Sequence, residues 1–346
     1  MYDFLKADDL SQLRKFSPSS RDEYLNHVQA IYNLKLHTDF PLVVHVETTN
    51  YCNQKCIMCC HPTMKRKPVH ISDVLAKKAL DECAKMNVWF VHFFFFGEPF
   101  INKNTLELMK YAKKVGVRQV SVTSNMTLIS KKEIEELVDS KIDSIHVSID
   151  GHDRESYKRI RKTDHYDKVV ENLDYLLEYK KKTNSTLPWT SVTFVRSDQS
   201  DEEVEIFKNQ WSNKVNDLHI SPQFEYRNGS ENGERRQEIG ETQVGRNDEN
   251  IMFYKEEDRV PCRQLWTRLV VLSNGELVPC SQNIDGELSL GNVKDISLHE
   301  AWTGNEMADL RMQHISNSFC GTRGNACKNC TDWDWSGKFE KRPVKK

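Results

Sequence analysis

Apolar and polar positions alternate with two different periods between residues 41 and 226. Short apolar or alternating runs, typical of strands, are separated by longer stretches whose apolar residues recur every three or four positions, as on one face of a helix. Strands that alternate with helices pair in parallel through right-handed crossovers. The expected strands are 41–47, 88–96, 119–123, 143–149, 188–195 and 217–226. The expected helices are 72–86, 102–115, 130–140, 153–161, 165–183 and 200–212.

Local signals mark several of these boundaries. Ser72 and Ser130 can cap helices, and Glu133 completes a capping box with Ser130. The run 88–96 is apolar throughout, which predicts a strand buried on both faces. Six strand–helix units can close partly into an incomplete barrel or lie open as a doubly wound sheet. The periodicity alone does not decide between these two folds.

The flanking segments differ in composition from this alternation. The part after about residue 255 holds five of the cysteines, a short strand at 268–272 and a helix at 297–313, so we expect a small domain held by ligation rather than by a core of its own. The expected organisation is a helical extension at 1–40, the α/β unit at 41–228, a polar linker or mobile loop at 229–254, the cysteine-bearing domain at 255–336 and a basic tail at 337–346.

Composition excludes several classes of protein. The chain has 346 residues and a formal net charge of −2, which does not fit a dedicated nucleic-acid binder with its basic face. No apolar run reaches the roughly 18 residues that span a membrane, and the N-terminus lacks the pattern of a signal peptide. We therefore expect a cytoplasmic protein, whose ten cysteines serve metal or cluster ligation rather than disulfides.

Three of the cysteines follow the first expected strand at close spacing. Cys52, Cys56 and Cys59 lie in a loop at the carboxyl end of that strand, where sites form in parallel α/β proteins. Three thiolates can hold three irons of a [4Fe–4S] cluster and leave the fourth iron open. The alternative is structural zinc, which needs four protein ligands. Cys60 or His61 would have to supply the fourth, but residues adjacent to Cys59 do not easily converge on one ion.

This spacing resembles that of the radical S-adenosylmethionine (SAM) superfamily, and the resemblance extends from about Pro41 to Asn228. It implies a TIM-like partial (β/α)6 barrel, which answers the question that the periodicity leaves open. In that family the open iron chelates the amino and carboxylate groups of SAM. An electron from an external reductant, such as flavodoxin or ferredoxin, then leads to cleavage of SAM to a 5′-deoxyadenosyl radical.

Further motifs of the family stand after the second strand. Gly97, Glu98 and Pro99 resemble the end of its Gly-Gly-Glu-Pro motif, which binds the SAM amino group. The chain departs from the family at Phe96, where the first glycine would stand, and at Met58, where an aromatic residue often lies near the adenine. A thioether can still pack against a base. Taken alone, the Gly-Glu-Pro segment would be equally consistent with an ordinary strand-to-helix turn.

Three more segments complete the expected SAM site. Ser124 and Asn125 follow the third strand and resemble the family's Thr-Asn-Gly segment. Ser148 and Asp150 follow the fourth strand and resemble a Ser-Ile-Asp-Gly motif that approaches the ribose. Arg161 ends a helical segment whose arginine pairs with the SAM carboxylate in the family, a task that suits a bidentate guanidinium. The motifs occur in order, each after the expected strand.

The C-terminal cysteines predict a second cluster. Cys262, Cys280, Cys327 and Cys330 resemble the ligands of the "twitch" form of the SPASM domain, which binds one auxiliary [4Fe–4S] cluster. The longer SPASM form needs about seven cysteines for two clusters, and only five occur here. Cys320 is then a spare or alternative ligand. A zinc ribbon is the competing interpretation, because four-cysteine sites with a Cys-x-x-Cys arm are common structural zinc sites.

The resemblance implies hydrogen abstraction from an unactivated carbon, with the auxiliary cluster passing one electron. We expect a small polar substrate, a sugar or aminocyclitol alcohol, with dehydrogenation or epimerisation as the outcome, and no membrane or nucleic-acid partner. Glu225, Tyr226 and Arg227, at the end of the sixth strand, are candidates for the catalytic base. The alternatives are a maturase of ribosomally made peptides and, outside enzymes, a zinc-stapled binding protein or electron carrier.

Overall fold

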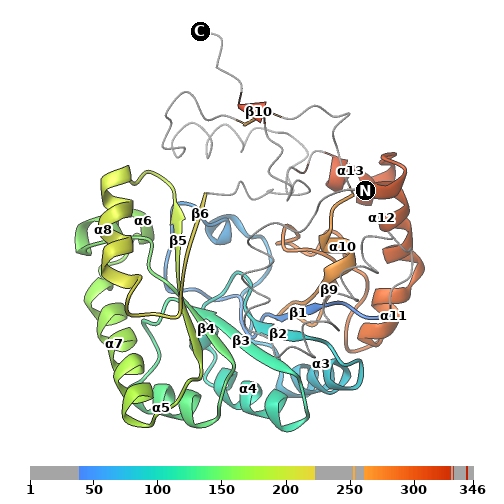
Figure 1. Ribbon diagram of the computed structural model, residues 1–346. Helices are drawn as coiled ribbons and strands as arrows, with labels where there is room; N and C mark the ends of the chain where they lie inside the picture. Colours follow the sequence, from blue (N-terminus) through green and yellow to red (C-terminus); the bar gives the residue numbers. More distant parts are fainter. Residues whose placement is uncertain (1–38, 223–251, 254–260, 329, 331–339, 342–346) are drawn as a thin grey trace.

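The computed structural model describes residues 39–222, 252–253, 261–328, 330 and 340–341. Its main element is an eight-stranded sheet with helices on its outer side (Figure 1). The strands are β1 (Val43–Val46), β2 (Phe90–Phe93), β3 (Gln119–Ser124), β4 (Ser144–Ser148), β5 (Trp189–Arg196), β6 (Asp217–Pro222), β8 (Arg268–Val271) and β9 (Leu277–Val278), with β7 (Met252–Phe253) and β10 (Glu340–Lys341) in a separate antiparallel pair. The helices are α3 (Asp73–Lys85), α4 (Thr105–Lys114), α5 (Lys131–Asp139), α6 (Arg154–Arg161), α7 (Tyr166–Lys182), α8 (Asp201–Trp211), α10 (Gln264–Thr267), α11 (Leu298–Thr303), α12 (Asn305–Ile315) and α13 (Gly321–Lys328), with short 3-10 turns η1 (His61–Thr63) and η2 (Pro99–Ile101).

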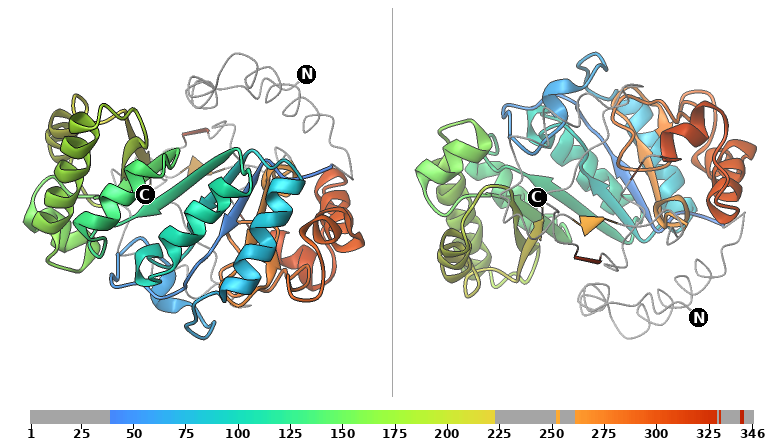
Figure 2. Two further views of the ribbon diagram at one scale, coloured as in Figure 1. Left: turned by 90° about the horizontal axis from the view of Figure 1, so that it is seen from below. Right: turned by 90° about the horizontal axis from the view of Figure 1, so that it is seen from above.

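The first six strands confirm the predicted partial (β/α)6 barrel. They lie in the order β6-β5-β4-β3-β2-β1, and every neighbouring pair is parallel. The sheet stays open, with β6 at one edge and β9 at the other. Figure 2 shows the curved sheet from below and from above. Most of the predicted segments 1–40, 229–254 and 337–346 lies outside the described residues.

Alternate positions along the strands separate the core from the inner face of the barrel. Val44 and Val46 of β1, and Val91 and Phe93 of β2, are fully buried in a core shared with helix residues such as Leu80 of α3. Successive side chains of a strand point to opposite faces. The intervening residues therefore point away from the helices, toward the inside of the barrel.

The C-terminal segment extends the sheet of the barrel. Strand β8 pairs in parallel with β1, and β9 returns antiparallel to β8. Leu269, Val271 and Trp302 join the same hydrophobic core as the barrel. Helix α11 packs beside α3 (Figure 2). The Leu298 amide donates to the carboxylate of Glu82 (2.5 Å). The expectation that ligation alone holds this segment was therefore incomplete.

Two predicted elements differ from the structure. Strand β2 ends at Phe93, because Phe95 and Phe96 leave the strand and pack in a second apolar cluster with residues of β8 and β9. The single helix predicted over 297–313 is two helices, α11 and α12. They break at Gly304, whose backbone is extended. Of the strand predicted over 217–226, β6 accounts for the described part.

Candidate active site

The loop between β1 and η1 carries the three predicted ligands of the first cluster. Cys56 is buried, and Cys52 and Cys59 are half-buried. Two backbone hydrogen bonds connect this loop to other parts of the barrel. The Ile57 amide donates to the carbonyl of Ile160 in α6 (3.0 Å), and the Glu98 amide donates to the carbonyl of Tyr51 (2.8 Å). None of the ten cysteines forms a disulfide.

Hydrogen bonds reach the sulfurs of two of the three thiols, Cys56 and Cys59. Burial raises the pKa of Cys52 to about 12 and that of Cys56 to about 11. A hydrogen bond from the thiol of Cys60 lowers the pKa of Cys59, whose Sγ also accepts from a backbone N–H at 3.4 Å. The guanidinium of Arg161 donates to Sγ of Cys56 at 3.7 Å. Such donors stabilise the thiolate form that ligates iron and tune a bound cluster.

The arrangement fits an iron–sulfur cluster better than a single metal ion. Zinc needs its four ligands within about 2.3 Å of one point. Across the described ranges, no three or more Cys, His, Asp or Glu side chains converge closely enough to hold one ion. Cys60 packs in the second apolar cluster with Phe95 and Phe96 rather than completing a tetrahedral site. A cluster that takes each thiolate on a separate iron is compatible with three ligands from this loop.

Glu98 links the ends of β2 and β3. Its buried carboxylate accepts hydrogen bonds from Ser124 Oγ (2.7 Å) and from the Asn125 amide (2.8 Å). Burial raises the pKa of Glu98, and these hydrogen bonds oppose the rise. The structure thus brings three predicted SAM-site residues into one hydrogen-bonded group, whose carboxylate could face an ammonium group.

Gly97 and Pro99 shape the backbone on either side of Glu98. A Cβ at Gly97 would lie 2.0 Å from the carbonyl oxygen of Thr49, so only glycine allows the two segments to approach this closely. Pro99 begins η2, and the Glu98 side chain caps this turn by accepting from the Phe100 amide. Both residues therefore have a structural role that would fix the position of the carboxylate.

Asp150 and Arg161 form a buried ion pair beside the cysteine loop. Asp150 Oδ2 lies 2.5 Å from a guanidinium nitrogen of Arg161, and Asp150 Oδ1 accepts from the Val195 amide (2.6 Å). Burial raises the pKa of Asp150, and the positive charge of Arg161 opposes the rise. The backbone of Asp150 is left-handed, with φ of 61°. Ser148 lies two residues earlier and shares a hydrogen bond with Thr193 (3.1 Å).

The sequence analysis missed the amide side chains that join these groups. Gln54 accepts from Arg161 (3.1 Å) and donates to the hydroxyl of Tyr157 (2.7 Å). Asn53 accepts from the side chain of Asn125 (2.9 Å). Both residues lie between Cys52 and Cys56, and this position was the only indication in the sequence that they belong to the site. Their partners are distant in sequence, so the spacing alone could not identify these contacts.

The predicted auxiliary ligands occupy the C-terminal segment. Cys262 is buried, its amide donates to Nδ1 of His314 (3.3 Å), and the half-buried Cys280 follows β9. The side chain of Gln264 accepts from the amide of Ser281 (2.9 Å). This hydrogen bond connects the segment that contains Cys262 to the segment that contains Cys280. Cys327 and Cys330 are joined in one turn by a backbone hydrogen bond of 3.0 Å. Cys320 is exposed.

Two further observations limit the site. The base candidates Glu225, Tyr226 and Arg227 lie outside the described residues.

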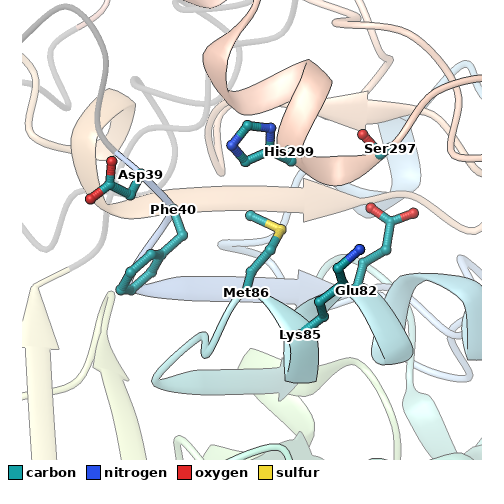
Figure 3. Close-up of a pocket in the computed structure, with 7 residues that line it drawn as sticks. All are labelled: Asp39, Phe40, Glu82, Lys85, Met86, Ser297 and His299. Atoms are coloured by element: carbon teal, nitrogen blue, oxygen red, sulfur yellow. The ribbon is translucent and has the colours of Figure 1, made fainter.

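A pocket of about 590 Å³ lies between α3 and the start of α11, where Glu82, Lys85 and Met86 face Ser297 and His299 (Figure 3). This pocket is at the amino ends of the strands, away from the cysteine loop, and none of the predicted site residues lines it.

Comparison with known proteins identifies the class to which this site belongs. The sequence profile of the radical SAM superfamily matches residues 46–209, and that of the SPASM iron–sulfur cluster-binding domain matches residues 262–331. The chain therefore contains a radical SAM domain, followed by a C-terminal SPASM domain. Its cofactors are therefore SAM, the [4Fe–4S] cluster that binds SAM, and auxiliary iron–sulfur clusters in the SPASM domain. In the part of the chain that the structure describes, no helix is long and apolar enough to cross a membrane.

Two curated relatives match part of the chain. A GTP 3′,8-cyclase of Chlorobaculum tepidum is 29% identical over 135 residues, 39% of this chain and 40% of the relative. A PqqA peptide cyclase of Bradyrhizobium diazoefficiens is 33% identical over 112 residues, 32% of this chain and 29% of the relative. The chain thus matches less than half the length of each relative.

Solved structures support the fold over most of the chain. Streptococcus suis SuiB bound to its precursor peptide SuiA has a TM-score of 0.62 and 16% identity, over 85% of this chain and 72% of SuiB. BtrN in complex with AdoMet and 2-DOIA has a TM-score of 0.53 and 16% identity, over 85% of this chain and 94% of BtrN. These identities are low, so the likeness concerns the fold.

Proposed function

We propose that this radical SAM enzyme modifies a peptide by abstracting a hydrogen atom from it. The observation that carries the proposal is the similarity to the PqqA peptide cyclase, which at 33% identity is the higher of the two curated matches above. The fold of SuiB, whose structure contains a bound precursor peptide, is consistent with it. A peptide substrate was the alternative in the sequence analysis, and a sugar or aminocyclitol was the first expectation.

The residues of the site take distinct roles in this proposal. Cys52, Cys56 and Cys59 hold the first cluster, which together with SAM supplies a 5′-deoxyadenosyl radical. Glu98 would present its carboxylate to the SAM amino group, and the hydrogen bonds from Ser124 and Asn125 favour its ionised form and hold it in position. Arg161 presents a guanidinium beside Cys56 for the SAM carboxylate.

The remaining predicted residues complete the cofactor sites. Gly97 and Pro99 fix the turn that carries Glu98, and Ser148 and Asp150 stand at the carboxyl end of β4 for the ribose. The auxiliary cluster is proposed to bind through four cysteines of the SPASM domain and to exchange one electron with the substrate. Those ligands are Cys262, Cys280, Cys327 and Cys330.

Oxidation of a sugar or aminocyclitol alcohol is the second candidate. Five cysteines follow residue 255, enough for one auxiliary cluster, as in the twitch-type relatives that act on such alcohols. The resemblance in the sequence analysis carries this candidate, together with a carbohydrate-like substrate and the dehydrogenase or epimerase outcome.

One assay tests the enzyme class and separates the two substrates. Anaerobically reconstituted protein is given SAM and dithionite, and 5′-deoxyadenosine is measured. Deuterated myo-inositol and a deuterated synthetic precursor peptide with the sequence of PqqA are then added separately. We expect deuterium in 5′-deoxyadenosine from the peptide. Transfer from inositol alone would overturn the peptide proposal, and absence of 5′-deoxyadenosine with both clusters loaded would overturn the assigned cluster and SAM roles.

A further inference from the structure

Three histidines from three different strands form a row on the inner face of the barrel. His45 of β1 pairs in register with His92 of β2, and His146 lies on β4. Each is flanked by valine, isoleucine or phenylalanine side chains that pack toward the helices, so the imidazoles point to the inside. We call these three side chains the imidazole row.

The members of the row are close enough to act on one ligand. The ring centroids of His45 and His92 are 5.1 Å apart, and those of His92 and His146 are 5.5 Å apart. A hydrogen bond of 2.9 Å joins Nε2 of His92 to the hydroxyl of Thr123 on β3. The row therefore crosses β1 to β4 as one connected polar strip.

Two of the three imidazoles, those of His45 and His92, favour the neutral form. Burial lowers the pKa of both His45 and His92 well below the usual value, and the positive charge of Arg268 on β8 contributes to the shift. A neutral imidazole carries one donor and one acceptor nitrogen. Among the described residues, Nδ1 of the buried His45 has no hydrogen-bond partner. The row is also not spaced for a metal ion within the described part of the chain.

The imidazole row lies next to the proposed SAM site, nearer to the amino ends of the strands. His146 precedes Ser148 by two residues on the same face of β4, a rise of about 7 Å along a strand. Thr123, the partner of His92, immediately precedes Ser124, which binds Glu98. A group held on the row would therefore lie within a few ångströms of the end of the barrel where the radical forms.

We propose that the imidazole row is the substrate-contacting surface of this enzyme, and that it binds hydroxyl or amide groups of the substrate through His92 and His146. The inference rests on the proposed function. Neutral imidazoles can both donate to and accept from such groups, and the nearby guanidinium of Arg268 makes the surface unfavourable for an ammonium group. His45, which is more deeply buried, supports the ring of His92 as a positioning residue.

Kinetics of single variants test the proposal with the full, cluster-loaded chain. His92→Asn and His146→Asn are compared with the matched control His299→Asn, an exposed histidine of α11. The probes are myo-inositol and the synthetic precursor peptide. The 5′-deoxyadenosine formed without a probe is measured for each variant as the reference for that variant. Its stimulation by the active probe should fall about tenfold in the two row variants, the loss of one hydrogen bond to substrate, and stay unchanged in the control.

The two proposals can fail separately. If wild-type protein forms no 5′-deoxyadenosine, the proposed function fails before the row is tested. If stimulation is unchanged in both row variants while their iron content and melting temperature match wild type, the imidazole row does not contact substrate.

A second measurement needs neither substrate nor turnover. Diethyl pyrocarbonate reacts with accessible neutral imidazoles, and mass spectrometry identifies the modified residues. We expect His92 and His146 to be modified in the folded protein, more slowly than His299. Modification of His299 alone, with the row reacting only after unfolding, would show a packed core and overturn the proposal.

Discussion

Adjacent cysteines differ in what surrounds each sulfur. Sγ of Cys56 accepts from Arg161, and Cys59 accepts from the thiol of Cys60. Cys60 itself is buried in the second apolar cluster, a position typical of a packing residue. At this scale the sulfur environments, and not the spacing alone, separate the proposed ligands from their neighbour.

This difference gives a paired prediction. Cys56→Ala should abolish the first cluster and the formation of 5′-deoxyadenosine, lowering the iron content from about eight to about four atoms per chain. Cys60→Ala should keep the iron content and the SAM-cleavage activity. Iron analysis and electron paramagnetic resonance of the reduced proteins provide the measurement. Equal loss of iron in both variants would show that Cys60 is a ligand.

Lys180 predicts a pH dependence of stability. Its buried ammonium donates to the Pro188 carbonyl (2.6 Å) and Thr190 Oγ1 (3.2 Å), and burial lowers its pKa to about 8. Between about pH 8 and the ordinary lysine value near 10.5, the unfolded chain binds more protons than the folded one. The free energy of unfolding contributed by this residue therefore rises with pH across that interval, by roughly 1 to 2 kcal/mol.

The Lys180→Met variant isolates this contribution. Anaerobic urea denaturation at pH 7.5 and pH 9.5 gives the change in the free energy of unfolding for each protein. Comparing the changes, rather than the absolute stabilities, removes the cysteine titrations common to both proteins. An identical change in wild type and variant would mean that Lys180 titrates normally in the folded state.

Many residues of the candidate site could be predicted from the sequence, but only where they belong to a short, local motif. Glu98, Ser124 and Asn125 were predicted separately and meet in one hydrogen-bonded group. The imidazole row was not predicted, because each histidine stands alone in its strand and only the sheet register makes them neighbours. Side chains from different strands converge through tertiary structure, which local spacing does not encode.

Among the elements, a buried ion pair joins the loop after η1 to the end of β1, and hydrogen bonds connect the same carboxylate to the C-terminal segment. Both carboxylate oxygens of Glu47 lie 2.7 Å from the guanidinium of Arg66. Ser273 donates to the same carboxylate through its amide (2.9 Å) and hydroxyl (2.8 Å). The pair therefore connects β1, the segment behind the cysteine loop, and the turn between β8 and β9.

Breaking this pair should be costly. Arg66→Met leaves the Glu47 carboxylate buried without its partner, which typically destabilises a protein by about 3 to 5 kcal/mol. The double variant Glu47→Gln with Arg66→Met should recover much of that loss, since a neutral amide oxygen can still accept from Ser273. Thermal unfolding under anaerobic conditions measures both. A double variant less stable than the single one would contradict the buried-charge explanation.

Periodicity predicted the elements of the barrel well and the C-terminal segment less well. The capping box of Ser130 and Glu133 is present, and α3 begins after Ser72 as expected. The strand predicted at 268–272 exists, but its partner could not be identified, because β1 lies far earlier in the chain. Gly304 in the helix predicted over 297–313 was the overlooked sign of a break.

At the scale of the whole molecule, the barrel and the SPASM segment share one sheet. Strand β1 is hydrogen-bonded on both sides, to β2 and to β8. A fragment of residues 41–228 would lack β8 and expose the free side of β1. Exposed strand edges pair with other chains, so we expect the fragment to aggregate where the full chain stays monodisperse, as gel filtration would show. A stable, monomeric fragment would contradict this expectation.

The shared sheet also bears on the order of events during synthesis. Val46 and its partner Val271 leave the ribosome at widely separated times, so the first strand waits for a neighbour that is translated much later. Loop closure over such a separation is slow. The sheet that carries the loop of Cys52, Cys56 and Cys59 is therefore completed only after Val271 has been translated.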